Sequence, residues 1–250
     1  MMKPILLIAF FLFSFYLSPS QPKPQTMNPE PLKFLALGDS YTIGESVDES
    51  ERWPVQLAAA LSKRDVSIAD PVIIARTGWT TDELNAAIDK ANTDKSGTFD
   101  LVTLLIGVNN QYRGRSAEEY RSEFKALLQR AIGFVGGKPS HVIVISIPDW
   151  GVMPFAEGRD HKQIAKEIDV FNAINWEEAV RAGVQYADIT PISREAGRYP
   201  ELIASDGLHP SGVQYKSWVE TIEPKVLKML SAIEEEKDSP RSHQEHKDSC

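Results

Sequence analysis

The sequence is poor in several features that would each point to a class of protein. It contains one cysteine, Cys250, so no disulfide can form within the chain. Its 27 Lys and Arg are outnumbered by 35 Asp and Glu, which gives a formal net charge of −8, and no Lys/Arg-rich run interrupts that balance. We therefore expect no nucleic-acid partner, because phosphate binding needs a clustered basic surface.

Familiar nucleotide and hydrolase motifs are missing as well. No Gly-x-Ser-x-Gly occurs, which disfavours the large α/β-hydrolase family, and no Gly-x-Gly-x-x-Gly supports a dinucleotide. The run Gly136-Gly137-Lys138-Pro139 lacks the first glycine and the hydroxyl residue of a phosphate-binding loop. We expect no cofactor and no metal.

The first residues have the layout of a secretory signal peptide. Met1–Lys3 carries positive charge, Ile5–Leu17 is almost wholly apolar, and Ser18-Pro19-Ser20 places small residues before a cleavage site at Gln21. The apolar run is shorter than the ~20 residues that span a bilayer. We expect an extracytoplasmic protein, periplasmic or secreted, with no stable membrane span after cleavage. An uncleaved signal anchor that tethers the protein to the membrane is the alternative.

The rest of the chain alternates apolar strands with helices. A length of 250 residues favours one domain. Strands that are apolar throughout indicate a parallel sheet covered on both faces, in which reactive groups gather at the carboxyl ends of the strands. The expected division is a signal peptide at 1–20, a linker at 21–30, the domain at 31–233 and a disordered polar tail at 234–250; the expected strands are Lys33–Leu37, Val72–Ala75, Leu101–Ile106, His141–Ile147 and Gln185–Asp188.

Chemically useful residues follow these strands. The four segments are Gly38-Asp39-Ser40, Arg76-Thr77-Gly78, Gly107-Val108-Asn109-Asn110 and, before the last helix, Ser205-Asp206-Gly207-Leu208-His209-Pro210. Taken together, in this order and at these places, they resemble the motifs of the SGNH (GDSL) hydrolase family and its lysophospholipase-like esterases. The likeness covers Phe34 to Ile233.

The resemblance implies a three-layer α/β/α, flavodoxin-like fold with a five-stranded parallel sheet. It also implies that Ser40 is the nucleophile of a catalytic triad completed by Asp206 and His209, with an oxyanion hole formed by Ser40, Gly78 and Asn109. The family's third motif usually ends in Asp, where this chain has Asn110, so the hydrogen bonding of that loop is in question. We expect Asn110→Asp to be tolerated.

The residue types fit these roles independently. A serine hydroxyl needs a neighbouring base, and histidine serves best near neutral pH. Asp206 lies three residues before His209 and could orient the imidazole. The simpler alternatives are an N-cap for Ser40, a capping aspartate in a turn for Asp206 and a turn glycine for Gly78.

These residues favour acyl transfer to a serine, followed by hydrolysis of the acyl-enzyme. A lysophospholipase-like esterase is the first expectation, and a carbohydrate acetyl esterase or a thioesterase is the alternative. Trp150, Met153 and Phe155 either line an acyl-binding wall or pack onto the domain. Two other classes stay open: a metal-dependent phosphoesterase using Asp39, Asp206 and His209, and a non-catalytic surface binding module.

Overall fold

A five-stranded, all-parallel sheet forms the centre of the protein, in the order β2-β1-β3-β4-β5. The computed structural model describes residues 30–91 and 99–238. Gly38 at the end of β1 pairs with Ala75 of β2 and Leu105 of β3, so the carboxyl ends of these strands are level. The strands are β1 Phe34–Gly38, β2 Val72–Ala75, β3 Leu101–Leu105, β4 Val142–Ile145 and β5 Gln185–Ala187.

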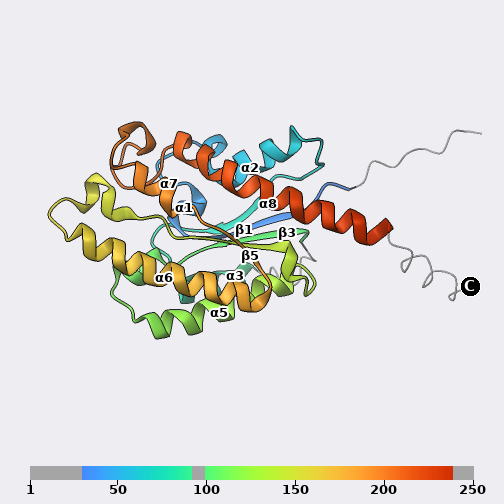
Figure 1. The fold of residues 1–250 in the computed structure, drawn as a ribbon, viewed down its shortest axis with the longest axis horizontal. Helices are drawn as coiled ribbons and strands as arrows, with labels where there is room; N and C mark the ends of the chain where they lie inside the picture. Colours follow the sequence, from blue (N-terminus) through green and yellow to red (C-terminus); the bar gives the residue numbers. More distant parts are fainter. Residues whose placement is uncertain (1–29, 92–98, 239–250) are drawn as a thin grey trace, which may run out of the picture.

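Helices cover both faces of the sheet and complete three layers (Figure 1). Helices α2 (Trp53–Ser62) and α8 (Gly212–Asp238) pack together on one face, whereas α3 (Thr81–Ala91), α5 (Ala117–Phe134) and α6 (His161–Ala182) cover the other (Figure 1). The expected three-layer α/β/α fold is confirmed. None of the helices within the described ranges is both long enough and apolar enough for a membrane span.

The core explains why the middle strands carry no polar face. Every residue of β1, β3 and β4 is buried, because helices lie on both sides. The largest buried side chains include Trp53 of α2 and Trp218 of α8, which fill the layer above the sheet. A parallel sheet enclosed in this way needs apolar residues at successive positions.

Most expected elements are present, with ends displaced by a few residues. The expected strand His141–Ile147 shortens to β4, because Pro139–His141 forms a 3-10 turn. Helix α8 continues to Asp238, past Ile233, so the first residues of the expected tail are helical. The expected signal peptide, nearly all of the linker and the remainder of the tail lie outside the described residues.

Of three short helices, only the first was expected from the sequence, since the alternative role of Ser40 as an N-cap implies a helix start there. They are α1 (Ser40–Ile43), α4 (Val108–Tyr112) and α7 (Thr190–Glu195). The first two follow β1 and β3 directly, so they turn the chain at the edge of the sheet where the motifs lie.

Candidate active site

The turn from β1 into α1 fixes Ser40. Asp39 caps α1, and its Oδ1 accepts a hydrogen bond from the Tyr41 N–H at 3.1 Å. Gly38 has no room for a side chain, since a Cβ there would lie 2.5 Å from the Leu105 carbonyl oxygen. Ser40 is thus the first residue of a helix, almost buried at 5% exposure, in a backbone that cannot shift easily.

Asp39 itself is fully buried and does not line the cavity that Ser40 lines. Burial raises the pKa of Asp39 to about 7, although the hydrogen bond from Tyr41 acts to lower it. Its Oδ2 has no hydrogen-bond partner within the described residues. Its position as a helix cap agrees with a structural role.

Asp206 and His209 form a hydrogen-bonded pair in the loop before α8. His209 Nδ1 lies 2.5 Å from Asp206 Oδ2, and the His209 N–H donates to Asp206 Oδ1 at 2.9 Å. The Ser46 hydroxyl donates to Asp206 Oδ2 at 2.8 Å. The ring of Tyr41 lies 5.4 Å from that of His209, so the imidazole is held on two sides.

The surroundings of Asp206 keep its carboxylate charged. Partial burial acts to raise the pKa, but hydrogen bonds from His209, from the Leu208 N–H and from Ser46 outweigh it and hold the pKa of Asp206 well below its usual range. A charged carboxylate at Nδ1 fixes the imidazole with Nδ1 protonated, which leaves Nε2 as an acceptor.

A cavity of about 150 Å³ lies where these residues meet. Ser40 and His209 both line it, whereas Asp206 lies behind His209 and does not. Within the described residues, the Ser40 hydroxyl makes no hydrogen bond to the ring of His209. The remaining lining residues are Tyr41, Val108, Asn109, Tyr112, Trp150, Phe155 and Leu208.

Asn109 is oriented at the cavity wall by the loop after β2. Its Nδ2 donates to the Trp79 carbonyl at 2.9 Å, which fixes the amide plane and leaves a second N–H. Gly78 precedes Trp79 and has a φ of +87°, a conformation that favours glycine. Gly78 does not line the cavity itself, and its carbonyl accepts a hydrogen bond from Arg113 at 2.7 Å.

Asn110 points away from the cavity and joins α3 to α5. Its Oδ1 accepts from the Thr81 N–H at 3.1 Å, and its Nδ2 donates to Thr81 Oγ1 at 2.6 Å. Nδ2 also lies 3.4 Å from Glu123 Oε2, to which the Thr81 hydroxyl donates. The amide donates where a carboxylate could only accept. The structure therefore gives a reason, absent from the sequence, to expect that Asn110→Asp is not tolerated.

Aromatic rings form one wall of the cavity. Tyr112 and Trp150 meet edge to face with ring centroids 5.4 Å apart, and Phe155 completes the group. Of the expected apolar wall, Trp150 and Phe155 thus line the cavity. Met153 does not: it is buried and lines a different hollow, beside Val152.

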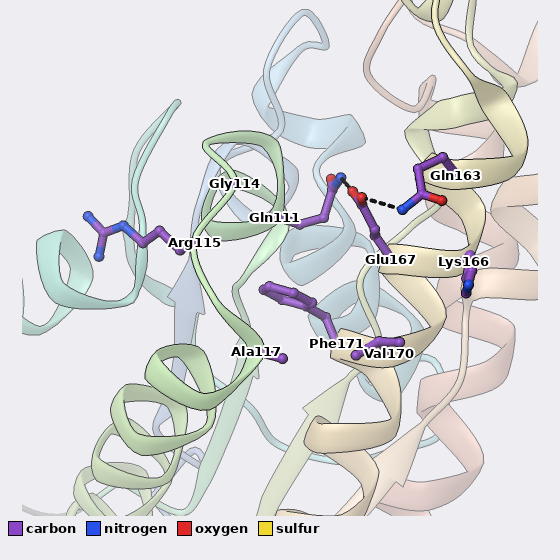
Figure 2. A pocket seen from close by; sticks show the side chains of 9 residues that line it. All are labelled: Gln111, Gly114, Arg115, Ala117, Gln163, Lys166, Glu167, Val170 and Phe171. Atoms are coloured by element: carbon purple, nitrogen blue, oxygen red, sulfur yellow. Dashed lines mark hydrogen bonds between the residues drawn. The ribbon is translucent and has the colours of Figure 1, made fainter.

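A row of polar side chains supports Trp150 from behind. Its Nε1 donates to Gln111 Oε1 at 2.8 Å, and Gln111 Nε2 donates to Glu167 at 2.7 Å. Gln163 donates to the other oxygen of Glu167, also at 2.7 Å, and a separate hollow of about 320 Å³ lies beside this row (Figure 2). The row fixes the indole from the side opposite the cavity.

A family comparison identifies this arrangement. Residues 36–216 match the family described as GDSL-like Lipase/Acylhydrolase, which is well over half of the chain. The chain belongs to the GDSL-like lipase/acylhydrolase family. This GDSL protein is accordingly a carboxylic ester hydrolase acting on small ester substrates. No curated protein sequence matches it significantly.

Solved structures share the fold of this GDSL protein. The crystal structure of TesA is 18% identical, covers 79% of this chain and 99% of its own, with a TM-score of 0.61. The esterase EstA from Pseudoalteromonas sp. is 14% identical, covers 80% and 98%, with a TM-score of 0.60. Axe2, an acetylxylan esterase from Geobacillus stearothermophilus, is 18% identical, covers 80% and 94%, with a TM-score of 0.59.

Several residues around the site of this GDSL protein were not singled out from the sequence. Ser46, which holds Asp206, carries a positive φ of 64° but no motif marks it. Tyr112 lies two residues after the third motif, and its aromatic side chain was the available signal. Nothing in the sequence connects Gln111 with Trp150, because they lie in two short helices 39 residues apart.

Proposed function

We propose that Ser40 is the nucleophile of this ester hydrolase, His209 its general base, and Asp206 the carboxylate that orients His209. The observation that carries the proposal is the Asp206–His209 bond, which leaves His209 Nε2 as the acceptor in a cavity that Ser40 also lines. Among the described residues the Ser40 hydroxyl makes no hydrogen bond to His209, and catalytic contacts of this kind often tighten only when substrate binds.

The reaction would proceed in two acyl-transfer steps. His209 takes the Ser40 proton while Oγ attacks the ester carbonyl, and it then protonates the departing alcohol. Water, deprotonated by the same imidazole, attacks the acyl-enzyme, and His209 returns that proton to Ser40 Oγ as the acid leaves. Asp206 stays charged throughout, because its hydrogen bonds hold its pKa well below the working range.

Asn109 would stabilise the oxyanion through the N–H that Trp79 leaves free. Backbone N–H groups at Ser40 and Gly78 would complete the hole. The position of Gly78 outside the cavity lining makes Asn109 the better supported of these donors. Donors aimed at the developing charge are worth more than ground-state contacts.

The dimensions of the cavity favour a short acyl group. A cavity of about 150 Å³ holds a molecule the size of benzene, so the 150 Å³ hollow beside Ser40 suits an acyl chain of up to about six carbons. A long lysophospholipid chain would have to leave it past the exposed rings of Tyr112 and Phe155. A short-chain acyl esterase is therefore our first choice, and a carbohydrate acetyl esterase, as Axe2 is described, the second.

We further propose export of the protein. The charged start, the apolar run and the small residues before Gln21 support a cleaved signal peptide. N-terminal sequencing of the mature protein should begin near Gln21, whereas a retained Met1 would favour the anchor.

A panel of esters tests the proposed function directly. Esters of one alcohol with acyl chains of two to sixteen carbons should give the highest kcat/KM at six carbons or fewer. Equal or higher values for sixteen carbons would favour the lysophospholipase-like alternative. Activity that disappears with a chelator and returns with metal would favour the phosphoesterase-type site.

A further inference from the structure

Arg159 lies against the aromatic wall of the cavity and has no role in the proposed catalysis. Its guanidinium carbon is 5.1 Å from the ring centroid of Tyr112, 5.3 Å from that of Trp150 and 5.7 Å from that of Phe155. All three distances are within the range of cation–π attraction. The same rings line the cavity that holds Ser40, so Arg159, which is exposed and not itself a lining residue, lies next to that cavity beyond its aromatic wall.

The charge of Arg159 is not neutralised by the protein. Within residues 30–91 and 99–238, every arginine except Arg76 and Arg159 forms an ion pair with a carboxylate. The neighbouring carboxylate of Asp160 is engaged elsewhere, since it caps α6 through the Gln163 N–H at 3.0 Å. A cation without a counter-ion next to the active-site cavity is available to a ligand.

The guanidinium of Arg159 is also held in place while most of its N–H groups stay available to a ligand. One Nη2–H donates to Tyr112 Oη at 3.1 Å, and the three rings lie close to the guanidinium carbon. A guanidinium has five N–H groups in a fixed fork, which suits two-point binding of a carboxylate or phosphate. In a chain of net charge −8, a local cation is what an anionic substrate needs to approach.

We propose that Arg159 selects ester substrates that carry an anionic group, a carboxylate or a phosphate, close to the ester bond. The proposal rests on the proposed esterase function and assigns Arg159 to specificity rather than to the chemical step. The anion belongs either to the acyl part or to the alcohol part of the ester, and matched substrates distinguish the two.

Two pairs of esters provide the test. On the acyl side, 4-nitrophenyl butyrate is compared with the 4-nitrophenyl monoester of succinate; on the alcohol side, 1-butyrylglycerol with 1-butyrylglycerol 3-phosphate. The variants are Arg159→Gln and Arg159→Lys. Arg64→Gln is the matched control for net charge. Arg64 follows the carboxyl end of α2, near the amino ends of the strands and away from the site, and pairs there with Glu223.

The wild type should prefer the anionic member of one pair. Loss of a charge-assisted, two-point contact should lower kcat/KM for that member roughly tenfold in Arg159→Gln, chiefly through KM, with the neutral member changed less than about twofold. Arg159→Lys should fall between, and Arg64→Gln should match the wild type. Salt should weaken the preference of the wild type, since about 0.1 M screens charges beyond ~10 Å.

Other results separate the possible failures. Equal losses for both members of each pair would mean that Arg159 only braces the rings, and the proposal would be overturned while the esterase function stood. Unchanged kinetics in Arg159→Gln would overturn it in the same way. If none of the four esters were hydrolysed and Ser40 resisted acylating reagents, the proposed function and this inference would fail together.

Discussion

Replacing Asn110 with aspartate tests how this chain departs from the usual family motif. The substitution turns a donor into an acceptor at 2.6 Å from Thr81 Oγ1 and brings a second carboxylate to about the 3.4 Å that now separates Nδ2 from Glu123. Two unit charges at 3.4 Å repel by about 5 kcal/mol at an effective dielectric of about 20.

Two effects reduce this repulsion. Protonating one of the carboxyls at pH 7 would relieve it at a cost of about 4 kcal/mol. Arg115 also lies 3.5 Å from Glu123 Oε2 and offsets part of the excess charge. We expect Asn110→Asp to lower the free energy of unfolding by about 2–4 kcal/mol at pH 8.

The sign of the pH dependence follows from the same repulsion. Glu123 raises the folded-state pKa of the new carboxyl above its unfolded value of about 3.9, so the folded state holds the proton more tightly. The stability deficit should therefore be largest at pH 8 and should shrink as the pH falls towards 5.

Urea denaturation of a double-mutant cycle measures the effect. Glu123→Gln together with Asn110→Asp restores one carboxylate and one amide, so the double variant should return to within about 1 kcal/mol of the wild type, with a coupling energy of about 2 kcal/mol or more. Our reasoning would be refuted by a single variant within about 0.5 kcal/mol of the wild type at pH 8, or by strictly additive changes.

Further predictions concern the site residues. A phosphonate should add one adduct by intact mass to the wild type and none to Ser40→Ala; an adduct that persists would place the nucleophile elsewhere. Asn109→Ala should lower kcat by ~10²–10³ with little change in KM, and a KM effect alone would assign it to ground-state binding. Asp206→Asn should lower kcat at pH 8, with circular dichroism as the control for folding. An unaltered kcat would exclude a role of Asp206 in orienting His209. Because burial raises the pKa of Asp39 to about 7, the free energy of unfolding should fall by about 3 kcal/mol as the pH rises from 5 to 8, and Asp39→Asn should flatten that slope in urea melts.

The fold was predictable because its signals are local. Apart from Thr103, strands β1, β3 and β4 carry only apolar residues and one glycine, which is the pattern of a sheet covered on both faces. Helix α4 has only 5 residues, too few to reveal a helical period, so it was not foreseen.

The candidate site was predictable to the same extent. The motif residues Ser40, Asn109 and His209 do meet at one cavity, because the carboxyl ends of parallel strands meet at one edge. The hydrogen bond between Arg159 and Tyr112 could not be predicted, because it joins the side chains of residues 47 apart in sequence. Gly78 was expected in the oxyanion hole from its motif. The motif correctly predicts a glycine loop after β2, but Gly78 does not line the cavity.

The bond from Ser46 to Asp206 joins positions 160 residues apart and ties the beginning of the domain to its end. During synthesis the proposed nucleophile leaves the ribosome early, whereas its base arrives just ahead of the last helix. A chain that stalls before Asp206 therefore holds a serine with nothing to activate it. If Asp206 and His209 act as proposed, only chains synthesised at least through His209 would hydrolyse esters, so the activity of a sample would be proportional to its content of such chains.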